Sequence, residues 1–371
     1  MFWKFITFFV RKFEPEIAHQ ISLIALKLGF YPRLKQIKIP VKINNLKFIN
    51  FLGVAAGFDK NAQVIEKMHH LNFGLTEVGT ITPLPQYGNP KPRIFRLEKD
   101  KAIINRNGFN NLGMAQAINK LKHYRKKFPV GSDFVLGVNI GPNKDSNDRF
   151  RDYEILSKGL SEFADYLTIN ISSPNTPNLR DFHETESLKK VLMSVKNGLA
   201  KSKNLHLPIF LKISPDITEN NLNQIIETAN KNNILGLIVS NTTVDRYKDL
   251  HPANLHEDGG LSGKPLFNKS TTLLALANKI IKYKKYNLYL IAAGGVLDAK
   301  SAYAKILCGA HLVQLYSSMT FDGPLIADNI LKGLLQLMNR DKISSIKDVR
   351  GKAGNPKAAM KIANNGFVDN L

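Results

Sequence analysis

The alternation of short apolar runs with longer helical patterns constrains the fold of this chain more than any other feature. From residue 51 onwards, eight runs rich in β-forming residues follow one another, and most are continuously apolar. They are residues 54–58, 77–80, 135–140, 166–171, 209–213, 237–241, 289–295 and 312–317. Continuous apolar runs are typical of parallel strands buried on both faces. Helical patterns lie between several of them, at residues 187–199, 219–231 and 269–283.

Eight strand–helix units in this order predict an α/β fold, a (β/α)₈ TIM barrel, for which ~250 residues is typical. The rival is a doubly wound open sheet, but no G-x-G-x-x-G and no Walker A sequence follows a strand. Residues 81–134, with four prolines near their start, predict an ordered insertion or lid. We therefore divide the chain into an N-terminal helical segment (1–40), the barrel (41–340) and a basic, polar C-terminal tail (341–371).

Composition narrows the class of protein. The chain has 371 residues, 52 of them basic and 30 acidic, which gives a net charge of +22. Such a surface attracts nucleic acid or anionic lipid. A disulfide scaffold and a cysteine-based zinc site are excluded because Cys308 is the only cysteine. Cys308 lies in a helix-like apolar stretch and is expected to be a packed core residue.

The N-terminal segment combines positive charge with aromatic residues at helical spacing. Phe2, Phe9 and Phe13 recur at helical spacing, and the apolar run 2–10 is too short to cross a membrane. A second apolar stripe, which includes Ile21 and Leu28, follows acidic residues and a proline that suit a helix start. Two short amphipathic helices are predicted, and the pattern leaves open whether they contact a membrane or pack on the barrel.

Polar residues gather at the predicted strand ends, where barrel enzymes carry their chemistry. The set is rich in asparagine and hydroxyl groups, has the single acid Asp59, and contains neither histidine nor cysteine. A metal site and a two-carboxylate glycosidase site are therefore disfavoured. Several asparagines together match a cyclic amide or imide such as a pyrimidine, although any one of them can simply tie a loop to backbone. Lys60 and Lys212 predict an anionic ligand or cofactor, and Gly294, Gly295 and the glycines of 259–263 predict a phosphate site.

These segments resemble the quinone-dependent, class 2 form of the dihydroorotate dehydrogenase family. The matching stretches are AAGFDK (55–60), EVGTITP (77–83), NRNGFNN (105–111), NISSPNTP (170–177), SNTT (240–243), GGLSGKP (259–265), GG (294–295) and QLYS (314–317). The amphipathic N-terminal arm (1–40) also fits class 2, and the resemblance implies that it serves membrane contact and quinone access. The resemblance implies an FMN-containing barrel that oxidises dihydroorotate to orotate in pyrimidine synthesis, with a membrane quinone as electron acceptor.

The resemblance also implies residue roles. Spacing alone leaves Ser172 and Ser173 open as the general base, and the resemblance selects Ser173. The implied substrate contacts are Lys60, Asn105, Arg106, Asn107, Gly108, Phe109, Asn170, Asn175, Asn241 and Thr242. The implied FMN contacts are Ala56, Gly57, Phe58, Asp59, Lys60, Thr80, Asn139, Asn170, Lys212, Ser240, Gly263, Gly295, Tyr316 and Ser317. Two positions depart from the family pattern: Ser240 replaces the usual threonine, and Asn107 replaces a residue that is commonly larger.

Three alternative functions fit the sequence less well. An FMN-dependent reductase of RNA uridines would suit the positive charge, but it would need a catalytic cysteine and an RNA-binding domain. A class 1 enzyme with a soluble acceptor would carry cysteine in place of Ser173 and lack the arm. A non-catalytic, membrane-associated barrel conflicts with the intact serine, lysine and asparagine set. We expect a monomer, bound peripherally to anionic lipid on the cytoplasmic side of a bacterial inner membrane, with no metal and no nucleic-acid partner.

Overall fold

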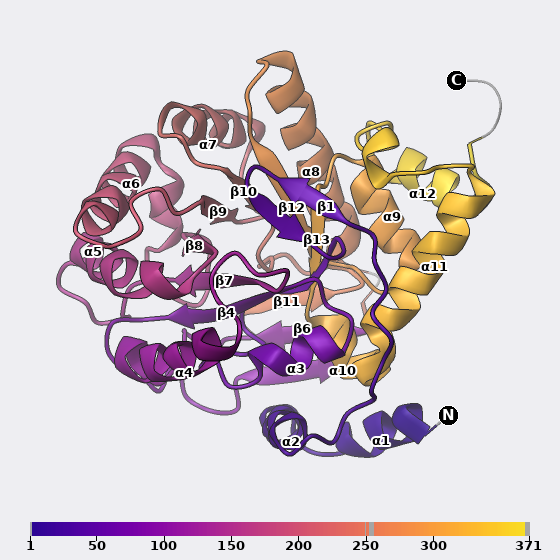
Figure 1. Cartoon of the computed structure of the whole chain (residues 1–371), viewed down its shortest axis with the longest axis horizontal. Coiled ribbons are helices and arrows are strands. Elements are labelled where there is room, and N and C mark those ends of the chain that lie inside the picture. The colour runs from indigo at the N-terminus through magenta and orange to yellow at the C-terminus, as the bar shows by residue number, and fades with distance from the viewer. Residues whose placement is uncertain (1, 249, 252–255, 368–371) are drawn as a thin grey trace.

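The computed structural model describes residues 2–248, 250–251 and 256–367. Its centre is a closed barrel of eight parallel strands in the order β10-β12-β13-β3-β4-β7-β8-β9 (Figure 1). The strands are β3 (Leu52–Val54), β4 (Leu75–Ile81), β7 (Val135–Ile140), β8 (Tyr166–Asn170), β9 (Ile209–Ile213), β10 (Gly236–Val239), β12 (Tyr289–Ala293) and β13 (Leu312–Leu315). The predicted TIM barrel is confirmed, and each predicted run contains or overlaps one barrel strand.

The strands differ from the prediction mainly at their carboxyl ends. The run 54–58 leaves the barrel after Val54, and Gly57 adopts a φ of +104° that suits glycine. Likewise β12 ends at Ala293, because Gly294 and Gly295 have φ values of +97° and +77°. At both places the residues are apolar or small, so the sequence predicts a strand, but in the structure they form the first turn of the loop that follows the strand. The barrel therefore presents a rim of loop backbone at its carboxyl end.

Helices surround the barrel in the expected alternation. They are α3 (Ile65–His70), α4 (Gly113–Lys127), α5 (Arg149–Leu160), α6 (Thr185–Ala200), α7 (Glu219–Lys231), α8 (Leu266–Tyr283), α9 (Ala299–Leu307) and α11 (Ile326–Arg340). The predicted range 219–231 coincides with α7, whereas α6 and α8 begin two and three residues before their predicted ranges. Each helix buries an apolar stripe on the strands, so the barrel and its helices share one core.

The barrel interior holds a buried carboxylate below the rim. Glu77 is fully buried and accepts hydrogen bonds from Asn139 Nδ2 (2.8 Å), Tyr166 Oη (3.0 Å) and Gln314 Nε2 (2.9 Å). Gly137 is required beside it, because a Cβ there would lie 2.2 Å from the Tyr166 ring. Three donors compensate the carboxylate for its lost hydration, so this layer forms a rigid floor for the rim.

The predicted insertion supplies two of the three strands of a second, smaller sheet. Strands β5 (Ile94–Leu97), β6 (Ala102–Asn105) and β11 (Gly260–Gly263) form an antiparallel sheet in the order β11-β6-β5. A separate hairpin of β1 (Val41–Ile43) and β2 (Leu46–Phe48) precedes the barrel. Because β6 ends at Asn105, the sheet carries the asparagine-rich loop 105–111 towards the barrel rim.

The two predicted N-terminal helices are present and pack on the barrel. Helix α1 (Phe2–Val10) packs against α10 (Ser317–Asp322), and α2 (Pro15–Lys27) packs against β5. Figure 1 shows both helices together at one edge of the molecule, next to α10. Glu16 of α2 bonds to Arg93 with a shortest distance of 2.5 Å, and both side chains are nearly buried. This ion pair joins the arm to the insertion sheet.

The C-terminal segment is more closely packed than its polar composition suggests. Helix α12 (Pro356–Asn365) packs against α9, and Ile346, Val349 and Ile362 join the main core. The buried residues of α12, which are Ala359, Ile362 and Ala363, lie on the face that packs against the barrel helices. Among the described helices, none is both long enough and apolar enough to cross a membrane.

Candidate active site

One cavity of about 430 Å³ opens at the carboxyl end of the barrel and extends beneath the N-terminal helices. Its size is typical of a small-molecule or cofactor site. Most of the predicted site residues line it: Ala56, Gly57, Phe58, Lys60, Thr80, Asn105, Asn107, Gly108, Phe109, Asn170, Ser173, Asn175, Lys212, Ser240, Asn241, Thr242, Gly263, Gly295, Tyr316 and Ser317. Residues that lie up to 261 positions apart thus meet in a single space.

Three predicted site residues do not line this cavity, and Asp59 is the first. Its buried carboxylate accepts the backbone N–H groups of Gln63 (2.8 Å) and Val64 (2.7 Å). Burial raises the pKa of Asp59, while these hydrogen bonds lower it. Asp59 therefore shapes the loop between β3 and α3, and any contribution to a ligand would come from its backbone.

Asn139 and Arg106 are the other two. Asn139 lies in the barrel interior, where it donates to Glu77 and accepts from Thr80 Oγ1 at 2.7 Å, so it supports a cavity residue from behind. The Arg106 guanidinium points away from the cavity, binds Glu257 at 2.6 Å and stacks on the Phe95 ring. Arg106 therefore anchors the loop that carries its asparagine neighbours.

The structure separates the two candidate serines. Ser172 is fully buried; its hydroxyl donates to Asn170 Oδ1 (3.0 Å) and accepts from Asn241 Nδ2 (3.0 Å). Ser173 lines the cavity, and among the described residues its hydroxyl oxygen accepts only the backbone N–H of Asn175, at 3.2 Å. The Ser172 hydroxyl is occupied in orienting two amides, whereas the Ser173 hydroxyl is available to a ligand.

The two predicted lysines reach the cavity from different sides. Lys212 pairs with Asn170 across β8 and β9, and it is 6% exposed. Burial lowers the pKa of Lys212, and the negative charge of Glu77 opposes that change. Burial lowers the pKa of Lys60 to about 8, with Arg93 lowering it further and Glu16 raising it. Within the described part of the chain, neither ammonium has a hydrogen bond or ion pair, so both suit an anionic ligand.

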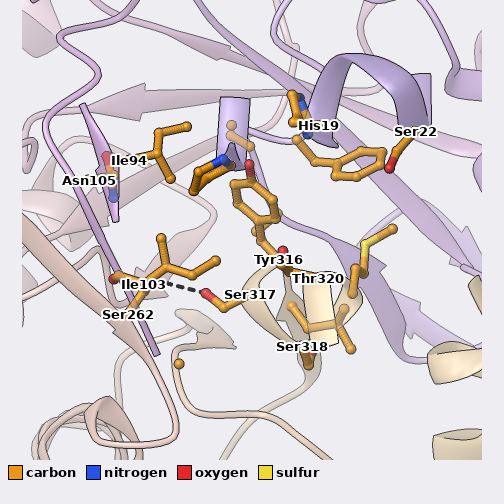
Figure 2. A pocket seen from close by; sticks show the side chains of 18 of the residues that line it. His19, Ser22, Ile94, Ile103, Asn105, Ser262, Tyr316, Ser317, Ser318 and Thr320 are labelled. Carbon is orange, nitrogen blue, oxygen red and sulfur yellow. Dashed lines mark hydrogen bonds between the residues drawn. The ribbon is translucent and has the colours of Figure 1, made fainter. Parts of the chain in front are cut away.

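A glycine cradle lies at another part of the wall. It consists of Gly263, Gly294, Gly295 and Ser317, and Ser317 Oγ lies 2.8 Å from Ser262 Oγ (Figure 2). At Gly295 an added Cβ would lie 2.3 Å from Phe267 Cα, so only glycine permits the first turn of α8 to approach so closely. Backbone N–H groups, hydroxyls and a helix start are the donors that phosphate prefers.

Comparison with known proteins agrees with this arrangement. Residues 38–338 match the family described as "Dihydroorotate dehydrogenase". The chain belongs to the dihydroorotate dehydrogenase family. It is 46% identical over 343 residues to the dihydroorotate dehydrogenase (quinone) of Bartonella henselae, covering 91% of this chain and 92% of the relative. It is 46% identical over 363 residues to that of Rhizobium etli (strain CIAT 652), with 94% and 96% covered.

Solved structures of the family share the fold. The structure of DHODH from Eimeria tenella in complex with ferulenol is 37% identical in sequence and has a TM-score of 0.86. The match covers 91% of this chain and 95% of the Eimeria tenella chain. The ligand-free form from the same organism gives the same TM-score. This chain is accordingly a flavoprotein oxidoreductase with the barrel of dihydroorotate dehydrogenases.

The two departures from the family pattern keep their places in the cavity wall. Ser240 is 3% exposed, and its hydroxyl donates to the carbonyl of Asn241 at 2.9 Å. Asn107 donates to Asn105 Oδ1 at 3.2 Å, and its own side-chain oxygen is buried with no hydrogen-bond partner among the described residues. Asn107 thus leaves an acceptor free for a ligand in this dihydroorotate dehydrogenase.

The N-terminal arm, which was expected to give a quinone access to the barrel mouth, lines part of the cavity, but His19 was not among the predicted site residues. Trp3, Ile21 and other residues of α1 and α2 line the cavity, as does His19. Figure 2 shows His19 and Ser22 across from Tyr316. The His19 ring packs edge-on to Phe58 at 5.3 Å, and burial lowers its pKa to about 3, helped by Lys60. The apolar stripe of α2 was visible in the sequence, but nothing in it indicated that His19 would face the barrel.

Arg180 is a second residue that sequence reasoning missed. Its guanidinium donates to the backbone carbonyls of Ser172 (3.4 Å) and Thr242 (3.2 Å) and to Asp216 Oδ2 (3.0 Å). It therefore joins the loops that follow β8, β9 and β10. The sequence indicated a role for Arg180 only through its position five residues after Asn175, in the loop that already held several candidate site residues.

Proposed function

We propose that this flavoprotein uses FMN to oxidise (S)-dihydroorotate to orotate, in pyrimidine biosynthesis, and passes the electrons to a membrane quinone. The observation that carries the proposal is the meeting of Ser173, the asparagine set and two unpaired lysines in one cavity with a glycine cradle. The same cavity continues between apolar residues of α1 and α2, which gives a lipid-soluble acceptor a route.

The asparagines suit a pyrimidine ring. Asn105 ends β6, Asn170 and Asn175 belong to β8 and the loop after it, and Asn241 follows β10. All four line the same cavity. Each amide offers a donor and an acceptor in one plane, which is what the ring's amide and imide groups require. Asn175 Nδ2 lies 3.4 Å from Asn105 Oδ1, so these two amides already orient each other. They would hold the ring flat while Lys60 binds its carboxylate.

Ser173 would take the proton from the substrate ring. Ser173 is 5% exposed, and its hydroxyl accepts one hydrogen bond of 3.2 Å, from the Asn175 backbone. The hydroxyl is therefore available to take a proton from a ring carbon of the substrate. A serine is a weak base unless its own proton can leave. Thr176 lies on the same loop, and its buried hydroxyl has no partner among the described residues, so it is a candidate for the relay.

The residues present fit FMN. When bound, FMN would accept the hydride that leaves the carbon next to the deprotonated one. Lys212 lies deep in the cavity beside Asn170, where its charge would stabilise an anionic reduced ring system. The Gly263, Gly295 and Ser317 cradle would hold the phosphate. The chain thus provides a cation at one end of the cavity and phosphate donors elsewhere along its wall.

The arm supports a peripheral place on the membrane. Phe2, Phe5 and Phe9 are 57%, 59% and 50% exposed, and no residue of α1 is buried. Lys12 follows this helix, with its ammonium 4.7 Å from the centre of the exposed Phe8 ring, where it would meet anionic headgroups. Arg11 is paired with Glu98 at 3.1 Å instead. We propose attachment to the cytoplasmic face of an inner membrane, as a monomer, with no role for nucleic acid.

The alternative activities find less support. A reductase of RNA uridines would need a catalytic cysteine, but Cys308 is fully buried at the end of α9 and does not line the cavity. A class 1 enzyme would place a cysteine where Ser173 stands. The arm that lines the cavity favours a quinone over a soluble acceptor.

Reduction of the bound flavin tests the proposal. The purified full-length protein should be yellow, and dihydroorotate added without oxygen should bleach the flavin absorbance and yield one orotate per flavin. A short-chain quinone should then restore the colour. A colourless protein that takes up no FMN, or a yellow one that dihydroorotate does not bleach, would refute it.

A further inference from the structure

Lys305 is a fully buried lysine that none of the motifs includes. It lies in α9, has no exposed surface, and donates one hydrogen bond, to Ser270 Oγ at 2.7 Å. Its ammonium lies 5.3 Å from the centre of the Phe267 ring, and it has no ion pair within the described residues. Burying an ammonium without a counter-charge is costly, so a lysine in this place requires a compensating partner.

The ammonium lies directly behind the glycine cradle. Ser270 Oγ, which accepts from Lys305, is also within hydrogen-bond distance of the carbonyls of Gly294 (3.0 Å) and Leu266 (2.8 Å). Both of these residues line the cavity. A Cβ on Gly294 would lie 3.0 Å from the same hydroxyl, so the cradle and Ser270 are in close contact. The hydrogen bonds from Lys305 to Ser270 and from Ser270 to the Gly294 carbonyl therefore connect the buried charge to the cavity wall.

We propose that Lys305 is a positioning residue for the phosphate of FMN. Its charge attracts the phosphate from behind Gly294 and Gly295, which have no side chains to separate the two. Its hydrogen bond to Ser270 holds the Gly294–Gly295 backbone in place. This inference rests on the proposed function, because FMN supplies the phosphate. The Lys305 side chain has no exposed surface, so its field is screened much less than that of a surface lysine.

The electrostatic state of Lys305 agrees with this role. Burial lowers its pKa to about 7, and Cys308 is the one described titratable group that interacts with it. Burial also raises the pKa of the Cys308 thiol to about 12, so this neighbour remains neutral and provides no counter-charge. An anion on the far side of the cradle would favour the charged form of Lys305.

The test compares FMN with riboflavin, which lacks the phosphate. Full-length protein and its Lys305→Met variant are freed of flavin, and the affinity for each flavin is measured by fluorescence quenching. We expect the variant to bind FMN about tenfold more weakly and riboflavin equally well. The free energy of unfolding without flavin should stay the same or rise, because a buried charge is removed. Lys300→Met, an exposed lysine of the same helix, is the matched control and should change neither affinity.

A second variant separates the charge from the hydrogen bond. Ser270→Ala keeps the ammonium and breaks its link to Gly294, and we expect a several-fold loss for FMN alone. An equal loss of FMN and riboflavin in both variants would show a purely structural role and overturn the inference. Unchanged FMN affinity in Lys305→Met would overturn it too. A wild-type protein that binds neither flavin would instead refute the proposed function.

Discussion

Replacing each of the two adjacent serines with alanine should separate catalysis from structure. Ser173→Ala removes one hydrogen bond, the one accepted from the Asn175 backbone, and should cost about 0.5–1.5 kcal/mol of unfolding free energy. If Ser173 is the base, the variant should slow flavin reduction ~10²–10⁴-fold, because a positioned base contributes that much. The corresponding rise in activation free energy is about 3–5 kcal/mol.

Ser172→Ala should show the opposite pattern. Its hydroxyl links Asn170 and the half-buried Asn241, and its loss removes two hydrogen bonds, each worth about 0.5–1.5 kcal/mol. Because both asparagines line the cavity, the dihydroorotate concentration at half-maximal rate should rise. The limiting rate at saturation should stay near that of the wild type, since the base is still present.

Anaerobic stopped-flow reduction of the bound flavin by dihydroorotate measures both quantities. It records the limiting rate and the substrate concentration dependence for each variant, and urea unfolding supplies the free energies. A near wild-type limiting rate in Ser173→Ala would remove Ser173 from the base role. A collapse of the limiting rate in Ser172→Ala alone would assign the base to Ser172 and contradict the argument from the hydrogen bonds.

Two further predictions concern Lys60 and the arm. Because the pKa of Lys60 is about 8 and its charged form would bind the substrate carboxylate, kcat/KM for dihydroorotate should fall about tenfold per pH unit above pH 8. In Lys60→Met this decline should disappear at a much lower kcat/KM, and a decline that persists would point to another group. Deleting residues 1–33 should leave dihydroorotate-driven flavin reduction largely intact while quinone turnover and liposome binding fall steeply. Liposome binding by the full chain should weaken with added salt, and unchanged quinone turnover in the truncated protein would show that the arm is only a packed appendage.

Much of the fold followed from local pattern. Strands such as β7 and β9 are buried on both faces, so nearly every residue in them is apolar, and their runs stand out in the sequence; Lys212 of β9 is an exception and faces the cavity. Helices such as α7 show their apolar stripe at helical spacing and were placed within a residue. The strand ends were less certain, because the glycines at 294 and 295 begin a loop through positive φ angles that composition does not reveal.

The site was predicted as a set but not side chain by side chain. Motif positions brought the correct loops together, since all carboxyl ends of a parallel barrel meet at one rim. Asp59, Asn139 and Arg106 nevertheless turn away from the cavity to hold loop backbone, the barrel floor and Glu257. Loops lack the regular spacing of helices and strands, so the sequence does not predict the direction of a loop side chain.

The sequence by itself therefore determined the barrel, the two amphipathic N-terminal helices and the chemistry available at the rim. Only the tertiary structure decided that Ser173 rather than Ser172 faces the cavity, that the arm forms part of its wall, and that Lys305 lies behind the cradle. Each of these depends on contacts between distant segments, such as the ion pair between Glu16 and Arg93. Local patterns record which face of an element is apolar, but they do not record which distant element covers that face.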